Sequence, residues 1–142
     1  MAEIPDEIPA EKEQIEIVVF HLKSVLILSD KSVIELAAIG AFIHNFYNGS
    51  ENILKQTFKL NGITFQKLPN WHKALINKAV AENIITDKLA NILFEFLSFR
   101  HYFVHGYGHM LKEEQLLALA GNLTDIWNDF YCQIEKYYRK KQ

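Results

Sequence analysis

The sequence contains a single cysteine, Cys132, so it cannot form an internal disulfide, and nothing in it requires an oxidising compartment. It has only three prolines and six glycines, too few for a chain rich in loops. No uninterrupted apolar run approaches the roughly 20 residues that span a bilayer. The first residues, Met-Ala-Glu-Ile-Pro-Asp-Glu, lack the basic and apolar regions of a signal peptide, so we expect a cytoplasmic protein.

What is present points to one helical domain. The chain has 142 residues, of which 49% are hydrophobic, and this is enough to close a core. Ten Phe, six Tyr and two Trp supply large side chains for that core. Residues 1–9 hold two of the three prolines. We therefore predict a flexible acidic tail over residues 1–10 and a single helical domain over residues 11–142.

Apolar residues recur at steps of three and four along most of the chain, which is the spacing of one face of a helix. Ser32 and Glu35 form a capping-box pattern, and we predict that the helix that begins there continues through Gly49. No segment alternates with a period of two for long. The fold class is therefore predicted to be all-α, an antiparallel bundle of four long helices plus one short helix. The expected helices cover residues 11–29, 33–58, 71–81, from Thr86 or Asp87 to the glycines at 106 and 108, and 113–139.

Charge is spread unevenly along the chain. The formal net charge is −2, but residues 1–16 contribute −5, so the remainder carries +3. Residues 96–112 contain no acid, whereas Arg100, Lys112 and three histidines fall there. This distribution permits contact with RNA without requiring it, because a modest basic patch is a weak signal.

The most informative stretch is Ser98-Phe-Arg-His-Tyr-Phe-Val-His-Gly-Tyr107, which places Arg100 inside an apolar and aromatic run. Burying a guanidinium costs free energy unless something anionic meets it. Arginine can hold phosphate oxygens with two parallel hydrogen bonds, and a histidine such as His105 can move protons near neutral pH. This pair is the minimal equipment for cutting a phosphodiester without a metal.

Arg100, His105 and Tyr107 follow the pattern R-x4-H-x-Y, with a polar residue, His101, directly after the arginine. Together with the stretches 41–54 and 68–72 (Leu-Pro-Asn-Trp-His), this pattern resembles the HepT-like ribonuclease toxins of the HEPN superfamily. The resemblance covers roughly residues 15–135.

The resemblance implies a metal-independent endoribonuclease, the toxin of a toxin–antitoxin pair, that cleaves transfer or messenger RNA. It implies a homodimer in which Arg100 and His105 of both protomers form one composite catalytic cleft, with His101 in support. Tyr107 matches the tyrosine that a minimal nucleotidyltransferase antitoxin modifies with AMP, which silences the nuclease. Toxin and antitoxin can also assemble into a larger hetero-oligomer. No cofactor and no membrane are implied.

The chemistry of RNA fits these roles, because the 2′-hydroxyl supplies the nucleophile. His105 could be the general base or the general acid, and Arg100 would stabilise charge on the phosphate. On an ideal helix a five-residue offset places the two side chains about 140° apart. They therefore share a face only if the helix unwinds near Gly106 or if a second protomer supplies one of them.

Structural explanations of the same residues remain open. Arg100 could pair with a carboxylate such as Glu95 or Glu51 inside the bundle, and His105 could be a helix-end histidine. Tyr107 could be an aromatic residue at a chain turn. Further residues that could reach the cleft in a supporting role are Asn45, Tyr47 and Glu51.

His101, His105 and His109 recur at four-residue steps, which is a spacing that metal sites use. The third histidine follows two glycines that are expected to end the helix, and no cysteine or acid completes a ligand set nearby. We therefore expect no metal site.

Three functions are compatible with the chain. The first is the ribonuclease toxin. The second is a non-catalytic helical module that binds a nucleotide or RNA, or that organises a dimer. The third, a regulatory helical protein without a nucleic-acid role, leaves the acid-free stretch 96–112 unexplained.

Overall fold

The computed structural model describes residues 4–5, 7–105 and 112–141. This part of the chain contains no β-strand, which confirms the all-α fold class. Four long helices and two short ones follow one another in the order α1 (Glu7–Leu26), α2 (Val33–Leu60), α3 (Trp71–Ala81), α4 (Asp87–Val104), α5 (Glu113–Ala120) and α6 (Leu123–Lys140).

The first helix begins at Glu7, four residues before the predicted start at Glu11. Pro9 lies in its first turn, where proline is tolerated because the backbone N–H groups there have no partner within the helix. Ile8 is fully buried, so this turn belongs to the packed part of the molecule. The apolar periodicity, which becomes regular only at Ile15, did not reveal this start.

The second helix forms as the sequence predicts. The Ser32 side chain accepts a hydrogen bond from the Glu35 N–H, and the Glu35 carboxylate accepts one from the Ser32 N–H. The helix continues through Gly49 to Leu60. Gly49 is needed because a Cβ there would lie 2.6 Å from Cγ1 of Ile15 on α1. The two helices therefore approach closely at this point.

The predicted final helix over residues 113–139 is wrong in one respect, because it is divided into α5 and α6 by Gly121 and Asn122. Glycine and asparagine are both poor helix formers, and Asn122 leaves the helical region with φ −105° and ψ 6°. The break changes the chain direction, so that Leu116 and Ala120 of α5 and Leu123 of α6 are all buried.

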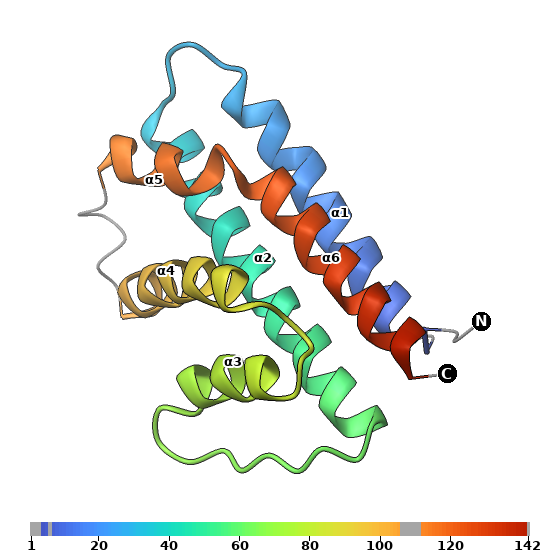
Figure 1. Ribbon diagram of the computed structural model, residues 1–142. Coiled ribbons are helices and arrows are strands. Elements are labelled where there is room, and N and C mark those ends of the chain that lie inside the picture. Colours follow the sequence, from blue (N-terminus) through green and yellow to red (C-terminus); the bar gives the residue numbers. More distant parts are fainter. Residues whose placement is uncertain (1–3, 6, 106–111, 142) are drawn as a thin grey trace.

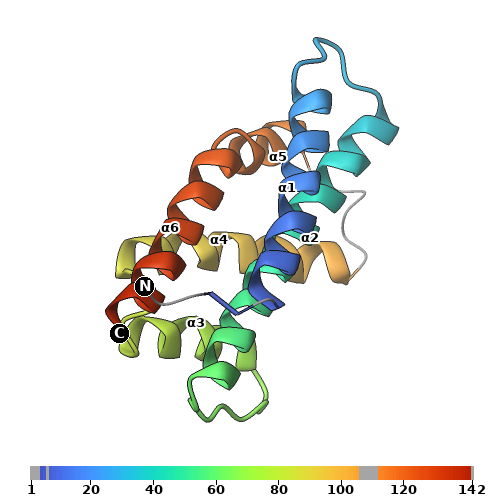
Figure 2. The ribbon, with the colours of Figure 1, turned by 90° about the vertical axis from the view of Figure 1, so that its right-hand side faces the viewer.

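The helices are arranged around α2. Antiparallel to α2 lies α1, while α4 crosses α2 obliquely in both views and is itself antiparallel to the short α3 (Figure 1, Figure 2). Phe46 of α2 is fully buried between Phe96 of α4 and Trp127 of α6, with ring centroids 5.2 and 6.5 Å away. Aromatic packing at this crossing fixes the position of α4, which carries the predicted site.

None of the described helices combines the length and the apolar character that crossing a membrane requires.

Candidate active site

Arg100 lies in the last turns of α4, half-buried, and points its guanidinium toward α2. Its Nε donates a hydrogen bond to Oδ1 of Asn48 at 3.3 Å. No described carboxylate pairs with it: Glu95 is exposed, and Glu51 binds another residue. A neutral amide thus positions the guanidinium and leaves its positive charge uncompensated.

The orientation of Asn48 is set one turn earlier on α2. Its Nδ2 donates to Nε2 of His44 at 3.0 Å, so its Oδ1 is turned toward Arg100. Burial, and then the positive charge of Arg100, lower the pKa of His44 below its usual 6.5. His44 is therefore neutral at neutral pH and can accept this hydrogen bond. The three side chains form a chain of hydrogen bonds that ends at the guanidinium.

A second polar pair lies one turn further along α2. Glu51 is only 4% exposed, and its Oε2 lies 2.6 Å from Nδ1 of His72, the second residue of α3. The His72 ring stacks on Trp71, with the centroids 3.7 Å apart. Burial and the nearby Glu51 charge raise the pKa of Tyr47, so this buried phenol stays neutral.

A cavity of about 390 Å³ opens between the start of α3 and the end of α4. We call it the anion cavity, because its lining carries the cations Arg100 and Lys73 and two histidines but no carboxylate. A phosphate group would find a bidentate donor and a second positive charge there. The lining residues are Asn70, His72, Lys73, Leu97, Ser98, Arg100 and His101.

His105 ends α4 as its C-cap residue, and its backbone N–H donates to the carbonyl of His101. Its exposed ring lies 4.4 Å from the ring of His101, measured between centroids. His105 does not line the anion cavity, whereas Arg100 and His101 do. Among the described residues, no hydrogen bond or ring contact joins Arg100 and His105. Tyr107 and His109 lie outside the described residues.

Residues 38–141 match the family described as HepT-like protein, and this range covers more than half of the chain. The chain belongs to the HepT-like family. The matched range contains α2 from its second turn onward and all of α3 to α6, and with them every residue of the anion cavity. No curated protein matches the chain, and no solved structure does.

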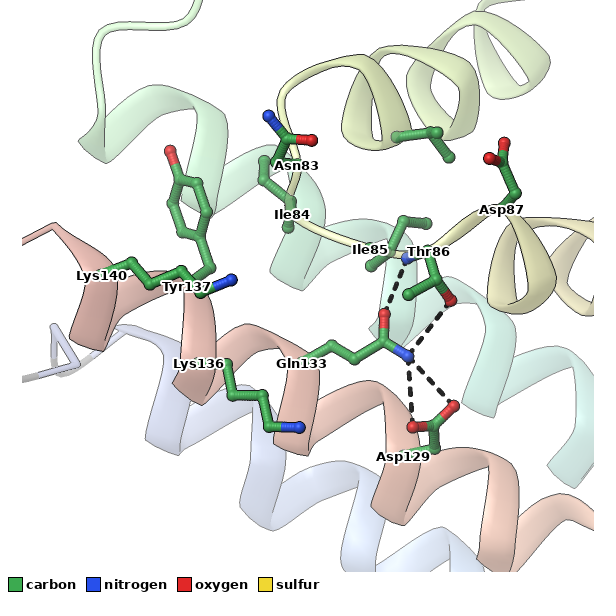
Figure 3. A pocket seen from close by; sticks show the side chains of 11 residues that line it. Asn83, Ile84, Ile85, Thr86, Asp87, Asp129, Gln133, Lys136, Tyr137 and Lys140 are labelled. Carbon is green, nitrogen blue, oxygen red and sulfur yellow. Dashed lines mark hydrogen bonds between the residues drawn. The ribbon is translucent and has the colours of Figure 1, made fainter.

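A larger cavity of about 660 Å³ in this HepT-like protein lies at the other end of α4, against α6 (Figure 3). Gln133 connects the two helices there: its Oε1 accepts from the Thr86 N–H at 2.9 Å, and its Nε2 donates to Asp129. Two acids and two lysines share the lining, so the cavity does not favour an anion. Those four residues are Asp87, Asp129, Lys136 and Lys140.

Sequence reasoning did not single out His44, Asn48 or His72 as site residues. A signal for part of the set was present, because His44, Asn48 and Glu51 are polar residues that recur at helical spacing along α2. Of the supporting residues named from the sequence, Tyr47 and Glu51 lie on this side of α2. Asn45 is exposed and lines a groove beside α1 instead.

Proposed function

We propose that this HepT-like protein is a metal-independent endoribonuclease and the toxin of a toxin–antitoxin pair, acting on RNA in the cytoplasm. The observation that carries the proposal is the anion cavity, in which Arg100 is held by a neutral amide and no carboxylate lines the wall. A guanidinium kept charged in a half-buried position favours a phosphodiester as its ligand.

In this proposal Arg100 holds the phosphate and stabilises the charge that develops on it, while His105 transfers a proton. The 2′-hydroxyl of RNA is the nucleophile, so metal-activated water is not needed. His105 of the same chain lies beside His101 but is not itself among the residues that line the cavity, which supports a homodimer with a composite site. His101, which lines the cavity, would assist by contacting RNA.

The same site supports a means of silencing. A minimal nucleotidyltransferase antitoxin would attach AMP to Tyr107, two residues after His105, within a toxin–antitoxin complex. The added phosphate could then pair with Arg100 and occupy the place of the substrate phosphate. Loss of inhibition in Tyr107→Phe, measured as RNA cleavage in the presence of antitoxin and ATP, is the expected result; a Phe variant that is still fully silenced contradicts it.

The first test is cleavage of total cellular RNA by purified protein in EDTA, with Arg100→Ala and His105→Ala beside the wild type. We expect wild-type activity to survive chelation and both variants to lose about 100-fold or more. Arg100→Lys, which keeps the charge but not the planar fork, should recover only part of the activity. If unmodified wild type cleaves no RNA while Tyr107 is shown bare by mass spectrometry, the nuclease proposal fails and a binding module remains.

A further inference from the structure

The Glu51–His72 pair has no part in the function proposed so far, although His72 lines the same cavity as Arg100. Apolar contacts already hold α3 in place, because Leu75, Ile76 and Ala79 are all fully buried. The contact is a hydrogen bond between a buried carboxylate and a partly exposed imidazole, and burying a carboxylate costs free energy that such a bond only partly offsets. The pair therefore needs another explanation than anchoring the helix.

The geometry of the pair fixes the state of the imidazole. Nδ1 faces Oε2 of Glu51 at 2.6 Å, and a carboxylate can only accept, so Nδ1 carries a proton. In the neutral ring this leaves Nε2, on the opposite edge, with a free lone pair. The ring is only partly exposed, with 21% of its side chain accessible, and is held flat against Trp71. An oriented imidazole with a free Nε2 is the arrangement that proton-transfer histidines use.

We propose that His72 is a second proton-transfer residue of the ribonuclease site, the general base for the 2′-hydroxyl of an RNA whose phosphate Arg100 holds. Glu51 is its positioning residue. The inference rests on the proposed nuclease function, and it assigns the base to the same cavity that the phosphate-binding arginine lines.

The proton of the 2′-hydroxyl passes to Nε2 of His72 while O2′ forms a bond to phosphorus. The bond between phosphorus and O5′ breaks with its electron pair, and O5′ takes a proton from the protonated His105. The products are a 2′,3′-cyclic phosphate and a 5′-hydroxyl, and exchange of protons with water restores both histidines.

The decisive variant is His72→Asn. The asparagine amide can place an N–H near the position of Nδ1 and so keep the hydrogen bond to Glu51, but it has no counterpart of Nε2. A residue that only ties α3 to α2 should tolerate this change. A general base should not, and we expect a loss of about 100-fold or more in kcat with an unchanged unfolding midpoint. Glu51→Gln should lose about 10-fold or more, because it no longer selects the tautomer.

The pH dependence of kcat supplies a readout that a structural role does not move. We expect kcat of the wild type to follow a bell-shaped curve against pH. In His72→Asn the rise of kcat on the acid side should be lost, and in His105→Ala the fall of kcat on the alkaline side should be lost. The wild type and both variants are measured on the same RNA oligonucleotide. A second oligonucleotide with a 2′-deoxy substitution at the cleaved position is the control that should not be cleaved. The charged or titratable groups near His72 are Glu51 and Lys55 on α2, Lys67 before α3, Lys73 on α3, and Arg100 and His101 on α4.

The outcomes separate this inference from the function on which it rests. If wild type does not cleave RNA at all, the proposed nuclease function fails. If wild type cleaves and His72→Asn cleaves at the same rate with the same pH profile, the nuclease stands and the role of His72 is overturned. A hundredfold loss together with disappearance of the acid-side rise supports the role.

Discussion

Arg100 of α4 donates from Nε to Oδ1 of Asn48 of α2, and the two residues are 52 positions apart in the sequence. The partner is an amide, so it orients the guanidinium without neutralising it. A carboxylate in the same place would satisfy the arginine and leave little attraction for a phosphate. The charge of the cavity thus depends on the side chain at position 48.

Asn48→Asp tests this dependence directly. The substitution places a carboxylate beside Arg100, and we expect RNA cleavage to fall by about 10- to 100-fold, with weaker RNA binding that depends less on salt concentration. Asn48→Ala should cost less, because it removes the positioning contact but leaves the charge. Cleavage rates and binding at several salt concentrations check both.

Asn45→Asp is the matched control, because it adds the same charge one turn away at an exposed position beside α1. It should leave cleavage within about twofold of wild type, since exposed charges are screened. Equal losses in the two Asp variants would mean that overall charge, and not the contact with Arg100, sets the activity.

His44 should make stability depend on pH. In the unfolded chain His44 binds a proton below about pH 6.5. In the folded protein its pKa is lowered, so His44 binds the proton only at a more acid pH. Between these two values the unfolded state holds more protons, so the free energy of unfolding falls as pH decreases. Well above pH 6.5 both states hold His44 neutral, and its contribution to the free energy of unfolding is constant.

Urea unfolding of wild type and His44→Gln between pH 8 and pH 5 measures the effect. Glutamine can still accept from Asn48 but does not titrate, so the difference in stability between the two proteins should shift in favour of the variant below pH 6.5. A difference that stays constant with pH would exclude His44 as the titrating group.

Gly49→Ala should destabilise the protein by about 1–3 kcal/mol, because the new Cβ would lie 2.6 Å from Ile15 and force α1 and α2 apart. This outweighs the gain of about 1 kcal/mol that alanine brings to a helix. A double-mutant cycle with Ile15→Ala, followed by thermal or urea unfolding, checks the cause: the penalty should vanish when Ile15 is already shortened. An undiminished penalty would place the strain elsewhere.

Gln133→Ala should separate stability from activity. It removes the acceptor of the Thr86 N–H at the far end of α4, and we expect a loss of about 0.5–1.5 kcal/mol in the free energy of unfolding. RNA cleavage below the unfolding transition should stay at the wild-type rate. A reduced rate in fully folded protein would show that this end of α4 matters for the site.

Local signals in the sequence predicted most of the helices. The capping box at Ser32 and the short helix Trp71–Ala81 were predicted and are present, and of the two predicted starts of α4, Thr86 and Asp87, Thr86 is the N-cap. Each depends on residues within a few positions of one another. The break at Gly121 and Asn122 was missed. These two residues can also lie within a continuous helix, and the packing of α5 and α6 on the core decides whether the helix is broken or continuous.

The partners of the site residues could not be predicted in the same way. Arg100 meets Asn48 and Glu51 meets His72 only because α3 and α4 both pack against α2, and no spacing within one helix encodes these contacts. The sequence motif suggested Arg100 and His105 as a pair, but in the described chain His105 lies against His101. A motif specifies which residues matter to a family and not which of them touch in one protomer.

The order of these contacts along the chain has a consequence for synthesis. Asn48 and Glu51 on α2 leave the ribosome first, then His72, and last the arginine that Asn48 must hold. Phe46 of α2 packs against both Phe96 of α4 and Trp127 of α6, and Gln133 of α6 accepts from the Thr86 N–H at the start of α4, so this packing is complete only after α6 has been made. In the proposed ribonuclease, a growing polypeptide would therefore lack the fully packed cavity until α6 has left the ribosome.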